Sequence, residues 1–271
     1  MSHLKRLVDS RWFLITRPKP RAQYRLFCFP YAGGSATAFN SWEDLLPSSI
    51  ELVAIQPPGR ANRMDEDPLT SVADMAGQLA RALPSMLDRP YLVYGHSLGA
   101  IVSFEVLHAL QAGRLPAPRW YFCAARRAPQ APPRIGPIHE YPLEKFKSEL
   151  KSFNGTPDVI LENDDLMELL VPMLRTELKA AYVYHREPDA KLECNVSVFG
   201  GARDQVVLPQ ELAGWQDHFS APMDLRIFAG GHFFMEDNKK LVVNAICERA
   251  GLSRPASQPS PAQTLPASGL T

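Results

Sequence analysis

The chain has 271 residues, with 29 Lys plus Arg against 29 Asp plus Glu, so its formal net charge at pH 7 is zero. A balanced chain lacks the basic excess that polyanion binding requires, and nucleic acid is therefore not expected as a partner. Hydrophobic residues make up 45% and charged residues 21%, which is typical of a globular protein with a sizeable core. The length suits one α/β domain with insertions.

Near the start, only residues 12–15 form an apolar stretch. This stretch is too short for a signal-peptide core or a membrane span, so we expect a cytoplasmic protein without membrane contact. Four cysteines (Cys28, Cys123, Cys194 and Cys247) are widely spaced, with no CxxC pair. We expect them to be reduced core residues rather than disulfide partners or metal ligands.

Short apolar runs alternate with longer amphipathic segments, which predicts strands and helices in turn and hence a mostly parallel sheet. Strands are predicted over residues 24–29, 51–55, 91–94, 120–124, 196–199 and 225–228. Helices are predicted over residues 72–87, 98–112, 209–219 and 238–250. Several of the strands are apolar throughout, as expected when helices cover both faces of the sheet.

Residues 128–188 interrupt this alternation with a proline-rich entry followed by helical patterns over 143–153 and 166–184. We predict a helical cap over the sheet edge; the alternative is a helical excursion with no gating role. Residues 253–271 hold four prolines and few large apolar side chains, which predicts a disordered tail. Residues 1–252 are thus expected to form one domain.

Residues 95–99 read Gly-His-Ser-Leu-Gly and lie directly between a predicted strand and a predicted helix. This G-x-S-x-G pattern in that context predicts a nucleophile elbow, which holds a serine on a sharp strand-to-helix turn. Ser97 is the candidate nucleophile, and the backbone N–H of Leu98 is the first candidate oxyanion donor. Alternatively, Ser97 is only an N-cap, which leaves both glycines unexplained.

A serine nucleophile needs a base, and in this arrangement the acid and then the histidine follow the serine along the chain. Three histidines are candidates. His218 lies in a predicted helix and His185 in the predicted cap, whereas His232 follows a predicted strand directly in a Gly-Gly-His-Phe-Phe turn. Because ligands bind at the carboxyl ends of parallel strands, His232 is the predicted base.

Asp204 follows another predicted strand after a Gly-Gly-Ala-Arg spacer and is the predicted acid. Its competitors fit less well, because Asp217 lies in a predicted helix, Asp224 begins a strand and Glu236 follows the histidine. The alternative for Asp204 is a loop aspartate that caps the next turn.

The second oxyanion donor should come from the glycine-rich loop that follows the strand at residues 24–29. Pro30 has no N–H, so Tyr31 or Ala32 must donate, and we select Ala32. The alternative is a glycine-rich turn that serves only the backbone geometry.

Six sequence blocks together resemble the type II (external) thioesterases of polyketide and non-ribosomal peptide synthesis, a branch of the α/β-hydrolases. The blocks are FCFPYAGGSATAF, PPGRANR, YGHSLGA, AARRAP, FGGARDQVV and AGGHFFM, within residues 20–250. The resemblance implies an α/β-hydrolase fold with a helical cap. It also implies a triad of Ser97, Asp204 and His232, with Ala32 and Leu98 in the oxyanion hole and no metal or cofactor.

The resemblance further implies a monomeric enzyme whose partner is an acyl or peptidyl carrier protein. The enzyme would hydrolyse acyl groups, typically aberrant or misprimed ones, from the phosphopantetheine arm of that partner. The predicted substrate-binding residues are Tyr31, Met173 and Phe233. Met173 belongs to an apolar set expected to limit acyl length or, alternatively, to form only cap core; the other members are Met167, Leu170 and Leu174.

Carrier proteins are generally acidic, and five arginines are docking candidates by position alone: Arg60, Arg63, Arg126, Arg127 and Arg134. The alternatives for each are a solvated face or a structural ion pair. Two other functions stay open on the sequence. One is a carboxylesterase or lipase, because a triad does not choose between oxygen and sulfur esters, and the other is an inactive hydrolase fold that acts as a binding module.

Overall fold

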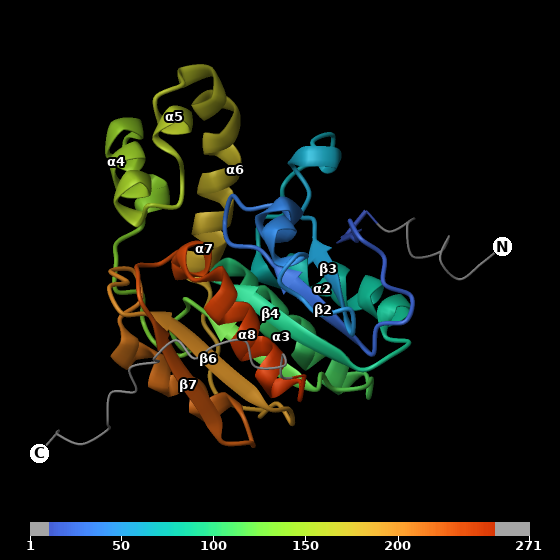
Figure 1. Ribbon diagram of the computed structural model, residues 1–271. Helices are drawn as coiled ribbons and strands as arrows, with labels where there is room; N and C mark the ends of the chain where they lie inside the picture. Colours follow the sequence, from blue (N-terminus) through green and yellow to red (C-terminus); the bar gives the residue numbers. More distant parts are fainter. Residues whose placement is uncertain (1–10, 253–271) are drawn as a thin grey trace, which may run out of the picture.

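The computed structural model describes residues 11–252 and contains a seven-stranded sheet in the order β1-β3-β2-β4-β5-β6-β7 (Figure 1). The strands are β1 (Phe13–Leu14), β2 (Tyr24–Phe29), β3 (Ile50–Ile55), β4 (Tyr91–His96), β5 (Trp120–Ala124), β6 (Val196–Gly201) and β7 (Met223–Phe228). β1 pairs antiparallel with β3, and every other pairing is parallel. The predicted mostly parallel sheet is confirmed, whereas the predicted tail at 253–271 lies outside the described residues.

Both faces of the sheet are buried, because side chains alternate along each strand. In β2, Phe27 and Phe29 belong to one hydrophobic cluster, while Leu26 and Cys28 belong to another. All four cysteines are buried, as expected for core residues. β7 is the exception at the sheet edge, since most of its residues are partly or fully exposed.

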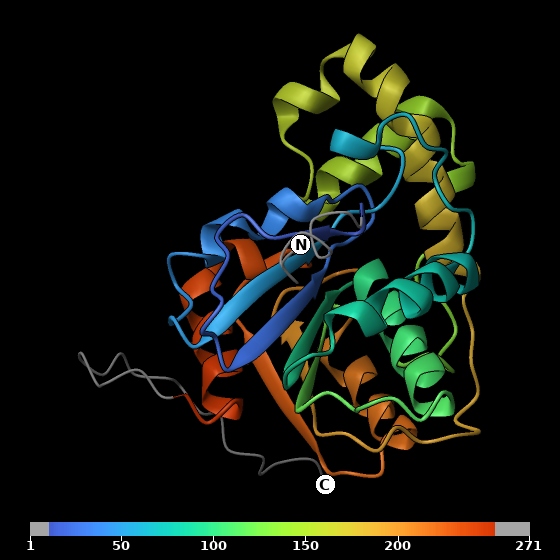
Figure 2. The same ribbon diagram turned by 90° about the vertical axis from the view of Figure 1, so that its right-hand side faces the viewer.

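Helices cover both faces (Figure 2). α2 (Val72–Ala82) and α3 (Leu98–Ala112) pack together on the side of Phe27 and Phe29, and the 3₁₀ helix η5 (Pro209–His218) contributes to the same cluster. The 3₁₀ helix η1 (Ala36–Trp42) and α8 (Lys239–Arg249) cover the opposite side, with α7 (Phe234–Asp237) just before α8. The short 3₁₀ helix η2 (Ala61–Arg63) follows β3.

Some boundaries differ from those predicted. The helix expected over 72–87 ends at Ala82 and continues as the 3₁₀ helix η3 (Leu83–Met86), because Pro84 has no N–H for a helical bond. The segment expected as an α-helix over 209–219 is 3₁₀, with Gly214 in its middle. The prediction missed β1 and α7, which are too short to show a period.

Between β5 and β6 lies a helical segment that rises above the carboxyl end of the sheet (Figures 1 and 2). This segment, called the insertion below, contains η4 (Ile138–Glu140), α4 (Leu143–Phe153), α5 (Asp158–Leu161) and α6 (Asp164–Val183). It has an apolar cluster of its own, which includes Phe146 and Met173, and α6 also packs against α3. Among residues 11–252, no helix has both the length and the apolar character needed to cross a membrane.

Candidate active site

Ser97 occupies the sharp turn between the end of β4 at His96 and the start of α3 at Leu98. Its backbone has φ 54° and ψ −112°, a conformation that is strained for any residue with a side chain. The Ser97 N–H donates to the carbonyl of Ala124 at 2.9 Å, which ties the turn to the end of β5. The turn therefore holds the Ser97 hydroxyl at the carboxyl edge of the sheet.

The glycines on either side of Ser97 allow the backbone segments to approach closely. A Cβ atom on Gly99 would lie 2.2 Å from the carbonyl oxygen of Phe29, and one on Gly95 would lie 2.5 Å from that of Gly99. No real Cβ atom tolerates such distances to rigid backbone. Both glycines are thus explained by packing, and an N-cap serine alone would not require either.

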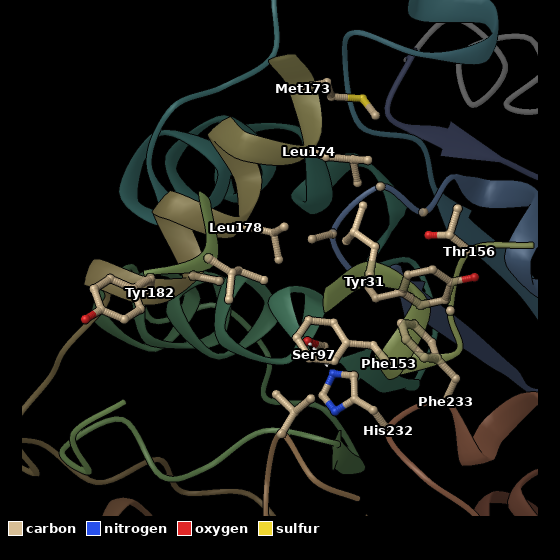
Figure 3. Close-up of a pocket in the computed structure, with 18 of the residues that line it drawn as sticks. Tyr31, Ser97, Phe153, Thr156, Met173, Leu174, Leu178, Tyr182, His232 and Phe233 are labelled. Carbon is tan, nitrogen blue, oxygen red and sulfur yellow. Dashed lines mark hydrogen bonds between the residues drawn. The ribbon is translucent and has the colours of Figure 1, made fainter. Parts of the chain in front are cut away.

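Ser97, His232 and Asp204 form a continuous hydrogen-bonded chain. His232 Nε2 lies 3.0 Å from Ser97 Oγ (Figure 3). His232 Nδ1 lies 2.9 Å from Asp204 Oδ2. Asp204 follows β6 and His232 follows β7, so the three side chains come from three strand ends. The structure therefore brings the three residues predicted from the sequence together at one edge.

Asp204 is held in its charged form. Burial alone would raise its pKa, but the hydrogen bond and charge of His232 and the backbone N–H groups of Val206 and Val207 together lower it. Those two N–H groups donate to Asp204 Oδ1 at 2.8 and 3.0 Å. An ionised Asp204 accepts from Nδ1–H of His232, which leaves Nε2 unprotonated and able to accept the Ser97 proton.

The loop between β2 and η1 borders the same cavity as Ser97. Among residues 11–252, the backbone N–H groups of Tyr31, Ala32 and Leu98 donate no hydrogen bond to another protein group. Ala32 and Ser97 both line this cavity, and Leu98 opens α3, where the positive end of the helix dipole lies. The arrangement leaves backbone donors available for a developing oxyanion.

The cavity above Ser97 has a volume of about 340 Å³ and lies between the sheet edge and the insertion (Figure 3). Tyr31, Phe233 and Met173, the predicted substrate-binding residues, all line it. Tyr31 and Phe233 meet edge to face, with ring centroids 4.8 Å apart. Leu170 and Leu174 also line the cavity, but Met167 does not and instead lies buried within the insertion. The prediction for Met167 as a lining residue was wrong, because it faces the insertion's own core.

The sequence of this chain is similar to those of known proteins, and this similarity identifies its family. The family model described as "Thioesterase domain" matches residues 24–250. The chain belongs to the thioesterase family. It is 34% identical to the gramicidin S biosynthesis protein GrsT of Aneurinibacillus migulanus, over 90% of this chain and 95% of that protein. It is 36% identical to the thioesterase PikA5 of Streptomyces venezuelae, over 92% of this chain and 89% of that protein.

Among solved structures, the thioesterase resembles the type II thioesterase BorB from the borrelidin biosynthetic cluster. The TM-score is 0.79 and the identity 31%, over 88% of this chain and 97% of BorB. The predicted α/β-hydrolase fold and the resemblance to type II thioesterases are both confirmed. The protein is therefore a thioesterase enzyme.

His96 is a residue of this thioesterase that the sequence analysis did not single out. It is fully buried, and burial, with a smaller effect of the His232 charge, lowers its pKa to about 3, so it stays neutral. Its Nε2 donates to the backbone carbonyl of His232 at 2.9 Å, and its Nδ1 accepts from the Tyr94 hydroxyl at 3.1 Å. His96, the second residue of the G-x-S-x-G pattern, thus holds the loop that carries the candidate base in place.

The arginines considered for docking of a partner are mostly inaccessible. Arg60, Arg63, Arg126 and Arg127 are each less than 9% exposed, and only Arg134 keeps an exposed side chain. Arg60 pairs with Glu177 and Arg63 with Glu66, which is the structural ion-pair alternative. Arg126 and Arg127 donate to the backbone carbonyls of Ala181 and Ala131. Of the five, burial therefore leaves only Arg134 on the outer surface, while Arg126 and Arg127 line the cavity above Ser97.

Proposed function

We propose that this thioesterase hydrolyses acyl groups from the phosphopantetheine arm of an acyl or peptidyl carrier protein in polyketide or non-ribosomal peptide synthesis. The single observation that carries the catalytic assignment is the chain Ser97 Oγ–His232 Nε2–Asp204 at 3.0 and 2.9 Å. The support for the substrate class is the similarity to GrsT, named for gramicidin S biosynthesis, and to BorB, named for the borrelidin cluster.

In the proposed acylation step, His232 accepts the Ser97 proton while Oγ attacks the thioester carbonyl. The N–H groups of Ala32 and Leu98 stabilise the oxyanion of the tetrahedral intermediate. When this intermediate collapses, the carbon–sulfur bond breaks, and the leaving thiolate takes the proton from His232. The products of this step are the acyl-Ser97 ester and the free phosphopantetheine thiol of the carrier.

Deacylation repeats the same proton transfers with water in place of Ser97. His232 removes a proton from the water, hydroxide adds to the ester carbonyl, and His232 returns the proton to Oγ as the carboxylic acid leaves. Asp204 remains ionised throughout and stabilises the imidazolium that forms in each step. The apolar lining, with Tyr31, Phe233 and Met173, suits a hydrocarbon acyl chain.

The test compares the wild type with Ser97→Ala on acyl-loaded carrier proteins and on acyl-N-acetylcysteamine thioesters. We expect the variant to lose turnover and fluorophosphonate labelling while its circular dichroism spectrum is unchanged. Hydrolysis by Ser97→Ala at the wild-type rate would refute the catalytic assignment. Equal turnover of p-nitrophenyl esters and carrier-bound thioesters by the wild type would refute the carrier preference and favour a general esterase.

A further inference from the structure

Two charged side chains from distant segments hold the loop that contains the candidate oxyanion donor Ala32. Glu177 Oε2 accepts a hydrogen bond from the Gly33 N–H at 2.7 Å, and Arg60 Nη1 donates to the Gly34 carbonyl at 2.7 Å. Both bonds fall on the two residues that directly follow Ala32. The backbone after Ala32 is therefore fixed by side chains that do not belong to the loop.

Glu177 and Arg60 also bind each other. Arg60 Nη1 lies 3.1 Å from Glu177 Oε2, and Arg60 Nη2 pairs with Oε1. Glu177 lies on α6 of the insertion, and Arg60 lies in the turn after β3, 117 positions away. Glu177 is only 3% exposed and Arg60 5%. Because a buried charge without a partner is strongly destabilising, substitution of either residue alone should lower the stability of the fold.

The position of these bonds gives the pair a role in the chemistry. The Gly33 N–H and the Ala32 carbonyl belong to the same peptide group. Because the Gly33 N–H is held in one direction, the ψ angle of Ala32 is restricted. An oxyanion donor stabilises the transition state only if it is oriented before the reaction, with about 2.7–3.1 Å to the oxyanion. The hydrogen bonds at Gly33 and Gly34 therefore restrict the backbone at Ala32, which lines the same cavity as Ser97.

We propose that Glu177 and Arg60 are positioning residues that hold the Ala32 N–H in the oxyanion hole. This inference rests on the proposed function, in which Ala32 stabilises the oxyanion. Since Glu177 belongs to α6, the oxyanion hole is complete only while the insertion is seated on the loop. The insertion thus contributes to the reaction itself as well as to the walls of the cavity.

The chain contains a closely matched control. Arg25 and Glu51 form a second buried ion pair, with Nε and Oε2 2.8 Å apart, at the amino ends of β2 and β3. Glu51 also accepts from a backbone N–H, that of Lys19, and Arg25 also donates to a backbone carbonyl, that of Met86. Both pairs thus combine a buried carboxylate that accepts from a backbone N–H with an arginine that donates to a backbone carbonyl. They lie at opposite ends of the strands, and Arg25 differs from Arg60 in pairing with a second carboxylate, that of Asp88.

The experiment measures kcat, KM and the melting temperature for Glu177→Gln, Glu177→Ala and the control Glu51→Gln. Loss of one oxyanion donor lowers rates about 10²- to 10³-fold, so we expect kcat to fall by up to about 10²-fold in Glu177→Ala. KM should change much less, because the lost interaction forms in the transition state. Glu51→Gln should lower the melting temperature to a smaller extent, because Arg25 keeps its pair with Asp88, and should leave kcat at the wild-type value.

A double variant separates positioning from the effect of an unpaired charge. Arg60→Met with Glu177→Leu removes both charges, and such replacements often restore stability. We expect its melting temperature to approach that of the wild type while kcat stays low, because Gly33 and Gly34 remain unbound. The midpoint of the pH dependence of kcat/KM should stay unchanged, since His232 and Asp204 are untouched.

Two results would overturn the proposal: wild-type kcat in folded Glu177→Ala or in the double variant, or an equal fall of kcat in Glu51→Gln. If Glu177→Ala does not fold, the double variant decides by the same criteria, because the amide oxygen in Glu177→Gln can still accept from the Gly33 N–H. Failure of the inference is distinguishable from failure of the proposed function. Active Glu177 variants beside an inactive Ser97→Ala variant refute only the positioning role, whereas an active Ser97→Ala variant refutes the function.

Discussion

The side chain of His96 supports the backbone of His232, with its Nε2 2.9 Å from the His232 carbonyl oxygen. The same imidazole lies edge to face with the His232 ring, at a centroid distance of 5.7 Å. A charged His96 would repel the imidazolium that forms on His232 during catalysis. Because its pKa is low, His96 stays neutral. It therefore keeps its hydrogen bond to the His232 backbone and places no positive charge beside the His232 ring.

Buried neutral histidines predict a loss of stability in acid. Burial lowers the pKa of His96 to about 3 and that of His108 to about 4, against 6.5 ordinarily. The unfolded chain then binds more protons than the folded one between these values and pH 6.5. The free energy of unfolding should therefore decrease as the pH falls below about 6.5, by up to about 1.4 kcal/mol per pH unit for each histidine.

Urea unfolding at pH 7, 6 and 5 measures this dependence. His96→Gln should reduce the slope, because one such histidine has been removed. His185→Gln, at an exposed position beside Glu187, is the matched control. A slope that is the same in the wild type and in His96→Gln would contradict the role given to His96.

Asp204→Asn should inactivate the enzyme without unfolding it. The amide oxygen still accepts from Val206 and Val207, but the amide NH₂ then faces His232 Nδ1 and favours the tautomer with Nε2 protonated. That tautomer cannot accept the Ser97 proton, and the corresponding change in a related triad lowers kcat about 10⁴-fold. Steady-state kinetics with a soluble thioester measures the effect. Asp217→Asn, on η5, should keep full activity. An active Asp204→Asn variant beside an inactive Asp217→Asn variant would instead identify Asp217 as the acid.

Gly99→Ala should disrupt the contact between α3 and the end of β2. The new Cβ would lie 2.2 Å from the Phe29 carbonyl oxygen, so backbone must shift. Overpacking typically destabilises by about 1–3 kcal/mol, and we expect at least this loss together with reduced activity. Gly77→Ala on α2 is the control, because its Cβ meets only the end of the Arg81 side chain, at 3.7 Å. The free energy of unfolding of Gly77→Ala should rise by up to about 1 kcal/mol, because alanine has the higher helix propensity. Denaturant unfolding measures the stability of both variants.

Met173→Trp should shift the acyl-length profile toward shorter chains. Met173 lines the cavity from α6, and a larger ring there takes up space that a long acyl chain needs. The measurement is kcat/KM for a series of about six acyl-N-acetylcysteamine thioesters whose acyl chains run from about two to about twelve carbons. Leu169→Trp, on the same helix but 57% exposed, should leave the profile unchanged. An identical profile in both variants would remove Met173 from the specificity determinants.

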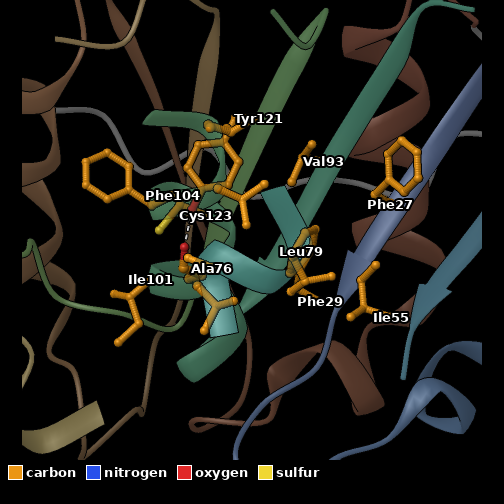
Figure 4. Packing of buried hydrophobic residues seen from close by; sticks show 14 of the residues in the cluster. Phe27, Phe29, Ile55, Ala76, Leu79, Val93, Ile101, Phe104, Tyr121 and Cys123 are labelled. Carbon is orange, nitrogen blue, oxygen red and sulfur yellow. Dashed lines mark hydrogen bonds between the residues drawn. The ribbon is translucent and has the colours of Figure 1, made fainter. Parts of the chain in front are cut away.

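The sequence predicted most of the sheet well because the central strands are buried on both faces. Phe27, Phe29 and Val93 pack on the side covered by α2 and α3, in the same hydrophobic cluster as Leu79 (Figure 4). Such strands are continuous apolar runs that end abruptly, and their limits differ from the observed ones by at most two residues. Local hydrogen bonding, rather than hydrophobic pattern, determines the 3₁₀ segments, and these were predicted less accurately.

The predicted triad residues could be found because each lies shortly after the end of a strand. Ser97 follows β4 directly, whereas Asp204 and His232 follow β6 and β7 after short turns, and all three positions lie at the carboxyl edge of the sheet. Glu177 could not be found in this way. It lies within an amphipathic helix, and its partners Arg60 and Gly33 are more than 100 positions away, so only the three-dimensional fold shows that they meet.

The candidate base follows a partly exposed edge strand of the sheet. Within residues 11–252, β7 pairs only with β6, and Leu225 and Ile227 are each 43% exposed. Segments with few buried contacts open locally at a lower free energy than the whole domain. Detachment of this strand would take His232 away from Ser97 while the rest of the sheet and α3 stay intact. In a denaturant titration, turnover should therefore disappear before the far-ultraviolet signal of the helices does.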